Sequence, residues 1–172
     1  MLLTKQQEFL LEILGRLGSA RLQQLAVLVQ RQFSLGSLDA AERMVGAALR
    51  QLQYGNAGVR LERDFAALEN RVPDNRLLDA IDVMLELSEN VPISFTAEQQ
   101  PLLLRFSVQQ NRVHTFAVVE SSQSLLLVNF QLLEKVVILL SQDERPMNLP
   151  IGNQQIFAIR QEDRSYRFFA PK

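Results

Sequence analysis

Residues 19–53 contain two amphipathic helical segments on either side of a short polar turn, Ser-Leu-Gly-Ser at residues 34–37. In the second segment the apolar residues follow helical spacing, at Ala41, Met44, Val45, Ala48 and Leu52. Residues with this spacing lie on one face of a helix, so they predict a buried stripe. The opposite face carries small, cationic and polar residues, at Arg43, Gly46, Ala47, Arg50 and Gln53. The pattern predicts a helix-turn-helix whose second helix turns this face outward.

Three polar residues mark where helices are expected to begin. A hydroxyl or carboxylate at an N-cap accepts a hydrogen bond from a free backbone N–H of the first turn. Thr4 is the predicted N-cap of a helix that ends near Gly18, and Ser19 is the predicted N-cap of the next helix. Either Ser37 or Asp39 can cap the third helix. Three short helices with one apolar face each are expected to pack together.

A hairpin is predicted after the third helix. Residues 54–58 form a Gly-rich turn sequence, and apolar and charged residues then alternate over residues 59–62. A tight turn at residues 63–64 leads into the apolar segment 65–68. Three helices followed by a hairpin predict a winged helix-turn-helix domain over residues 1–72.

The outward face of the third helix suits entry into the major groove of double-stranded DNA. The predicted contact residues are Arg43, Ala47, Arg50 and Gln53 on the helix, with Arg60 and Arg63 on the hairpin. Arginine can make paired hydrogen bonds to guanine or phosphate, and hairpin arginines often reach phosphates. In the alternative interpretation the two hairpin arginines are simply solvated. A homodimer is expected if the DNA site is a palindrome.

The charge distribution leaves a second function open. Residues 1–72 hold nine Lys/Arg and seven Asp/Glu, a net charge of +2, and residues 73–172 hold nine and twelve, a net charge of −3. A charge of +2 is well below that of a strong nucleic-acid binder, although all but one of these cations are arginines. The alternative hypothesis is a protein–protein adaptor whose winged helix no longer binds DNA.

Pro73 and Asp74 mark the predicted boundary of a second domain, residues 73–172. A helix is predicted from Asp74 and ends before Pro92. After this helix, apolar residues alternate with polar ones instead of following helical spacing, and this alternation predicts strands. The expected elements are strands at residues 93–95, 102–108 and 113–119, a helix at 120–133, a strand at 135–140, and a hairpin of residues 155–160 and 165–169. The chain is therefore predicted to be α+β, with a small α/β second domain.

The order helix, three strands, helix, strand resembles the restriction-endonuclease-like fold. A winged helix followed by such a domain resembles the replication-relaxation-like families of plasmids and conjugative elements. The resemblance rests on this order and on local sequence at residues 73–74, 79–83 (Asp-Ala-Ile-Asp-Val) and 116–120 (Phe-Ala-Val-Val-Glu). It implies a DNA-binding accessory or regulatory protein of a mobile genetic element, in replication, transfer or transcription control. The second domain would then mediate self-association or bind a protein partner.

The catalytic residues of such nucleases are missing. Active members hold Mg²⁺ with an acid on the second strand and an acid two residues before a lysine on the third. Here the second strand carries Arg105 without a carboxylate, and Glu120 is followed by two serines. The sequence therefore predicts an inactive domain with no catalytic residue, metal or cofactor. A divergent nuclease that uses Glu120 is the third hypothesis.

Other site types find little support. His114 is the only histidine and there is no cysteine, so a zinc site built from His and Cys is excluded. We interpret His114 as a polar strand residue. The first residues do not resemble a signal peptide, and the most apolar run, residues 125–140, is too polar to span a bilayer. These features predict a cytoplasmic protein without a membrane partner.

Overall fold

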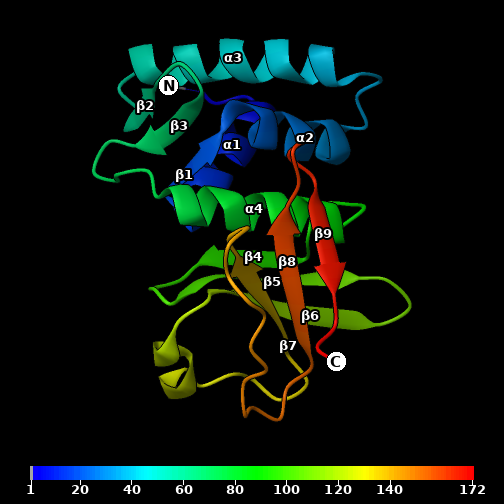
Figure 1. Cartoon of the computed structure of the whole chain (residues 1–172). Coiled ribbons are helices and arrows are strands. Elements are labelled where there is room, and N and C mark those ends of the chain that lie inside the picture. Colours follow the sequence, from blue (N-terminus) through cyan, green and yellow to red (C-terminus); the bar gives the residue numbers. More distant parts are fainter. Residues whose placement is uncertain (1) are drawn as a thin grey trace. The chain divides into compact units, whose positions relative to one another are not determined.

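The structure is a computed structural model that describes residues 2–172, and it is a mixed α+β fold with four α-helices and two β-sheets. The chain divides into two compact units, residues 1–81 and 82–172. Helix α4 (Asn75–Leu87) contributes to both units (Figure 1). Within residues 2–172, no helix is both long enough and apolar enough to cross a membrane.

Before α4, the first unit contains three helices and one three-stranded antiparallel sheet. Its elements before α4 are α1 (Lys5–Leu17), β1 (Ser19–Arg21), α2 (Leu22–Phe33), α3 (Leu38–Tyr54), β2 (Val59–Leu61) and β3 (Phe65–Leu68). Strand β3 lies between β1 and β2, so the sheet order is β1-β3-β2. The three predicted helices and the predicted β2–β3 hairpin are confirmed.

Two of the predicted helix starts are confirmed and one is wrong. The Thr4 hydroxyl accepts a hydrogen bond from the Gln7 N–H at 3.2 Å, and the Gln7 side chain accepts one from the Thr4 N–H at 2.9 Å. Ser37 is the N-cap of α3, and its hydroxyl accepts a hydrogen bond from the Ala40 N–H at 3.1 Å. Ser19 does not cap α2, because its backbone is in β1 and pairs with Ala67. The pattern missed this short strand, which depends on a partner far along the chain.

Helix α3 is held by an apolar face and by a partly buried polar contact with α1. On the apolar face of α3, the side chains of Leu49 and Leu52 are fully buried. Leu10 of α1, in the same unit, is also fully buried. The Gln7 side-chain amide donates a hydrogen bond to the Gln51 side-chain oxygen at 2.8 Å. Figure 1 shows α3 running across α1 and α2, with which it is in contact. The opposite face of α3 is thereby left exposed.

Gly18 ends α1 with a backbone φ of 79°, a region that favours glycine. We expect Gly18→Ala to lower the free energy of unfolding by about 1–2 kcal/mol, the cost of a left-handed backbone for an L-residue. The new Cβ would also lie 3.4 Å from the flexible Arg71 side chain.

The matched control is Gly15→Ala. Gly15 lies inside α1, and a Cβ there meets nothing within 4 Å. Because alanine favours helix more than glycine does, this variant should be more stable by about 0.5–1 kcal/mol. Urea unfolding of both variants checks the prediction, and equal shifts of the two would contradict it.

The second unit is built on one six-stranded sheet. The strands are β4 (Ser94–Ala97), β5 (Leu102–Gln109), β6 (Val113–Glu120), β7 (Lys135–Leu140), β8 (Gln155–Arg160) and β9 (Tyr166–Phe169). They lie in sequence order, with β6, β7 and β8 parallel and the other neighbours antiparallel. The predicted strands and the terminal hairpin are confirmed.

The helix predicted over residues 120–133 is wrong. Glu120 is the last residue of β6, and only a short 3₁₀ helix, η1 (Gln123–Leu127), follows. Within this segment only Leu125 is buried among the leucines, whereas Leu126, Leu127, Leu132 and Leu133 are exposed. After η1 the backbone also bonds to side chains: Arg105 donates to the Asn129 carbonyl, and the Gln131 N–H donates to Glu134. The connection between the parallel strands β6 and β7 therefore contains no α-helix.

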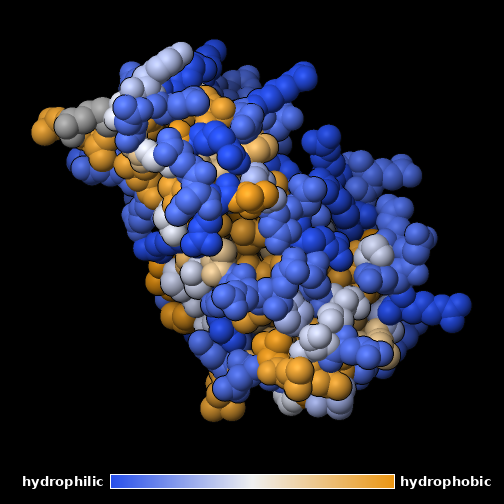
Figure 2. Space-filling model, turned by 90° about the vertical axis from the view of Figure 1, so that its left-hand side faces the viewer, coloured by the Kyte–Doolittle hydropathy of each residue, from blue (hydrophilic) through white to orange (hydrophobic). Residues whose placement is uncertain are grey.

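The face of the sheet next to this connection is apolar. Its buried cluster consists of Leu102, Ala117, Val119, Leu125, Val136, Ile138, Leu140 and Phe157. Val119, Ile138 and Phe157 lie side by side on the parallel strands, as their register requires. Apolar atoms also reach the surface, where Figure 2 shows separate hydrophobic patches among hydrophilic residues.

Candidate functional site

The exposed face of α3 carries three of the predicted contact residues. Arg43, Ala47 and Arg50 are exposed, and their spacing of four and three residues places them on one face of the helix. Gln53 is also exposed and lies at the edge of this face. We call Arg43, Ala47, Arg50 and Gln53 the α3 face.

Neither arginine of the α3 face is neutralised within residues 2–172. The ion pairs of that part of the chain involve other arginines, and the side chains of Arg43 and Arg50 make no hydrogen bond. The Arg50 guanidinium lies over Gly46, where an added Cβ would be 3.5 Å from it. The Arg50 side chain thus lies along the helix surface beside Gly46. Two unpaired guanidinium groups are free to receive an anion.

Three residues beyond the predicted set also belong to the surface of α3. Asp39, in the first turn, lies on the side that carries Arg43, and Glu42 lies at its edge. Tyr54 is 85% exposed, lies four residues after Arg50, and presents a phenol at the carboxyl end of the helix. Its spacing of four residues from Arg50 indicates the same side of the helix. The Gly-rich sequence that follows led to the assignment of Tyr54 to a predicted turn instead.

The two hairpin arginines are in different environments. Arg60 is in β2 and half-buried, with its Nε 3.4 Å from Glu62 Oε1 and its Nη2 donating to the Arg71 carbonyl at 3.4 Å. Arg63 is in the turn between β2 and β3 and is exposed, and within the described residues it has no ion-pair partner. Arg63 can therefore contact a ligand without breaking an internal contact, whereas Arg60 cannot.

In the second unit, Arg105 of strand β5 forms an ion pair with a buried carboxylate. The Arg105 Nε donates to Glu134 Oε1 at 2.8 Å, and Glu98 Oε1 lies 3.7 Å from the same guanidinium. The side chain of Glu134 is fully buried, and its second oxygen accepts the Gln131 N–H at 2.9 Å. The sequence pattern missed Glu134, because it is 29 residues from Arg105 and its role depends on the fold. These contacts make Arg105 and Glu134 structural partners.

Glu120 and Glu134 of the second unit have different positions. Glu120 ends β6, while Glu134 is bonded to Arg105. Across residues 2–172, no three His, Asp or Glu side chains are grouped so that they could hold a metal ion. Comparison of the chain with known proteins found no matching family model, no matching curated protein and no matching solved structure.

Proposed function

We propose that the first unit is a winged helix-turn-helix that binds double-stranded DNA through the α3 face. The order of helices and strands and the β1-β3-β2 sheet support this interpretation. In such a domain the helix that follows the turn enters the major groove, and the hairpin lies beside it as the wing. Here these roles fall to α3 and to the β2–β3 hairpin.

The unpaired Arg43 and Arg50 on an exposed helix face are the observation that carries this proposal. Guanidinium groups bind phosphate and guanine through paired hydrogen bonds. Ala47 lies between them on the helix surface and adds little bulk, so the backbone can approach the groove closely. Arg63, in the turn of the hairpin, would contact a phosphate of the neighbouring backbone, and Arg60 would support the hairpin from within.

The variant Arg43→Ala plus Arg50→Ala tests the α3 face. If each arginine neutralises one phosphate, the slope of log affinity against log salt should become shallower by about 1.8, since each phosphate contact on duplex DNA contributes about 0.9. Fluorescence anisotropy with a pool of random duplex DNA, repeated from low to moderate salt, measures that slope.

The control variant is Arg145→Ala plus Arg164→Ala. Both arginines are exposed in loops of the second unit, so the control removes the same net charge outside the α3 face. The proposal predicts an unchanged salt slope for the control. Equal slopes for the unaltered protein and the α3 variant would overturn the assignment of the α3 face.

The acidic residues of α3 favour a second candidate, a protein–protein adaptor. Asp39 and Glu42 are exposed in the first turns, where a DNA-binding helix approaches the bases. Tyr54 adds an exposed aromatic side chain, a residue type enriched in protein interfaces. Failure to bind any duplex at low salt, with the fold intact, would select this function.

The setting of the protein remains a prediction. A role in replication, transfer or transcription control of a mobile element comes only from the resemblance, as does self-association or partner binding by the second unit, and the second helix of that element order is absent here, over residues 120–133. A homodimer would give the α3 face the two-fold symmetry that a palindromic site requires. Sedimentation of the free protein and of its DNA complex measures the number of chains.

A further inference from the structure

A pocket of about 570 Å³ lies at the amino-terminal ends of the parallel strands β6, β7 and β8. Its walls come from the start of β6, from the end of the η1–β7 connection, from the start of β7 and from the segment before β8. Pockets for small molecules have volumes in this range. Because all its walls belong to the second unit, the pocket does not depend on the α3 face.

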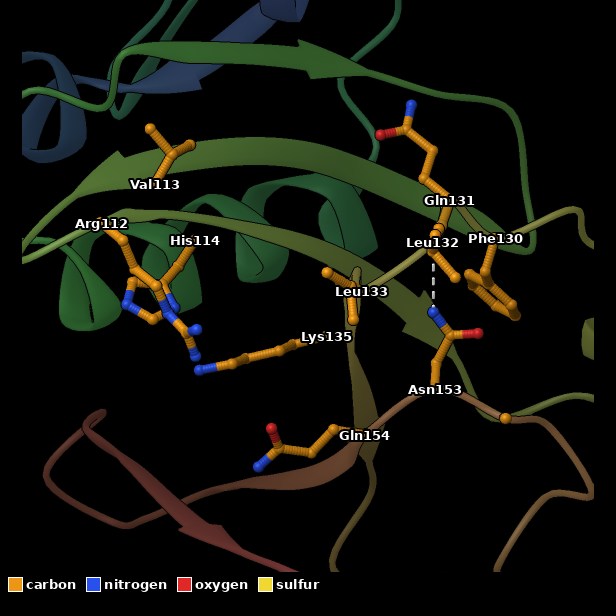
Figure 3. A pocket seen from close by; sticks show the side chains of 11 residues that line it. Arg112, Val113, His114, Phe130, Gln131, Leu132, Leu133, Lys135, Asn153 and Gln154 are labelled. Atoms are coloured by element: carbon orange, nitrogen blue, oxygen red, sulfur yellow. Dashed lines mark hydrogen bonds between the residues drawn. The ribbon is translucent and has the colours of Figure 1, made fainter.

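Three cationic or titratable side chains converge at one end of the pocket. Figure 3 shows Arg112, His114 and Lys135 directed toward one another. No Asp or Glu lines the pocket. The acid next to Lys135 in sequence, Glu134, is buried and bonded to Arg105, so it does not neutralise this cluster.

The positive charge around His114 contributes to a shift of its pKa. Partial burial, followed by the charges of Lys135 and Arg112, holds the pKa of His114 below its ordinary value. Lys135 Nζ also lies 5.5 Å from the centre of the Phe116 ring, within the range of a cation–π contact. Like charges held together without a counter-ion are stabilised when an anion binds among them.

The other end of the pocket combines apolar side chains with the Asn153 amide (Figure 3). Phe130 and Leu132 lie there, away from the cations (Figure 3). Leu132 and Leu133 are 93% and 87% exposed, and Leu133 has a backbone φ of 63°. Asn153 fixes this segment, because its side-chain amide donates to the carbonyls of Gln131 and Glu134 at 2.9 and 2.8 Å. An aromatic ring and an exposed leucine are thus held at the end of the pocket opposite the cations.

We propose that this pocket binds a phosphate-bearing small molecule with a flat ring, of the nucleotide class. The phosphate lies among Arg112, His114 and Lys135, where the guanidinium and the ammonium supply charged hydrogen-bond donors and the imidazole supplies a further N–H. The ring lies against Phe130, since stacking on an aromatic side chain suits any base. The volume of about 570 Å³ is in the range of pockets that hold small molecules of this size.

The single histidine provides a direct probe. In protein without a histidine tag, the imidazole proton signal of His114 is unambiguous by NMR. Adenosine 5′-monophosphate should shift this signal saturably and raise the pKa of His114, because the phosphate favours the imidazolium. Inorganic phosphate should do the same about tenfold more weakly, for want of the ring. Adenosine without phosphate should leave the pKa of His114 unchanged.

Two variants complete the test. Lys135→Gln should weaken binding of adenosine 5′-monophosphate about tenfold through loss of one charged hydrogen bond. Arg164→Gln, in the β8–β9 turn at the other end of β8, should bind as the unaltered protein does. Melting curves establish that both variants are folded. The absence of a saturable shift at constant ionic strength would overturn the proposal, and equal affinities for phosphate and adenosine 5′-monophosphate would overturn the ring site.

Discussion

Arg105→Ala is expected to lower the free energy of unfolding of the second unit by about 3–5 kcal/mol, the usual cost of leaving one partner of a buried ion pair without the other. The Glu134 side chain has no exposed surface, whereas Arg105 is 21% exposed. Removal of the guanidinium leaves a carboxylate that water cannot reach. The remaining donor to that carboxylate is the Gln131 N–H.

The loss should also loosen the connection between β6 and β7. The same guanidinium donates to the Asn129 carbonyl at 3.1 Å, so it ties this connection to β5 at two points. Residues 128–134 contain no regular secondary structure, so the Arg105 contacts and those of Asn153 hold them. Hydrogen exchange should therefore accelerate at the Gln131 amide more than at amides of α1 in the first unit.

A second substitution separates the charge from the packing. In Arg105→Ala plus Glu134→Gln, the amide oxygen can still accept the Gln131 N–H, but no buried charge remains. This variant should be more stable than Arg105→Ala alone by about 1–3 kcal/mol. Arg145→Ala, an exposed arginine in the β7–β8 connection, should change stability by less than about 0.5 kcal/mol. Urea unfolding followed by circular dichroism measures all three, and equal stability of Arg105→Ala and Arg145→Ala would refute the role of the ion pair.

The sequence could predict elements whose signal is local. Periods of hydrophobicity located three helices, the β2–β3 hairpin and the strands of the second unit, because each pattern is contained within its own segment. The same reasoning failed over residues 120–133, where leucines have helical spacing but only Leu125 is buried. Spacing reports which residues could share a face, and it does not report whether another element covers that face.

The candidate sites also differ in whether local sequence could predict them. The outward position of Arg43 and Arg50 follows from the buried stripe of their own helix, so the sequence could predict it. The internal contacts of Arg60 depend on Arg71 and on the fold of the hairpin. The cluster of Arg112, His114 and Lys135 depends on the parallel pairing of β6 with β7, which joins residues about twenty positions apart. No local pattern signals such a pairing.

Leu52→Ala should lower the free energy of unfolding of the first unit by about 2–5 kcal/mol, the range for removing a buried leucine side chain. Leu52 has no exposed surface and lies on the face of α3 opposite Arg43 and Arg50. Its backbone contact is unaffected, because its carbonyl accepts the Ala57 N–H at 3.0 Å whatever the side chain is. The whole loss therefore measures the apolar anchoring of α3.

The adjacent residue supplies the control. Gln53 is exposed on the same helix turn, and Gln53→Ala should change stability by less than about 0.5 kcal/mol. Urea unfolding of the two variants should separate them clearly. Similar stabilities would mean that α3 is not held by this face, and the exposure of Arg43 and Arg50 would lose its structural basis.

The same variant separates the anchoring of α3 from its proposed contact with DNA. At a temperature where Leu52→Ala is still folded, its salt slope for duplex DNA should equal that of the unaltered protein, because no phosphate contact is removed. Arg43→Ala plus Arg50→Ala should show the opposite combination, a shallower salt slope with a stability changed by less than about 1 kcal/mol, since both side chains are exposed and unpaired. If both variants lose stability and salt dependence together, the two faces of α3 do not have the separate roles assigned to them.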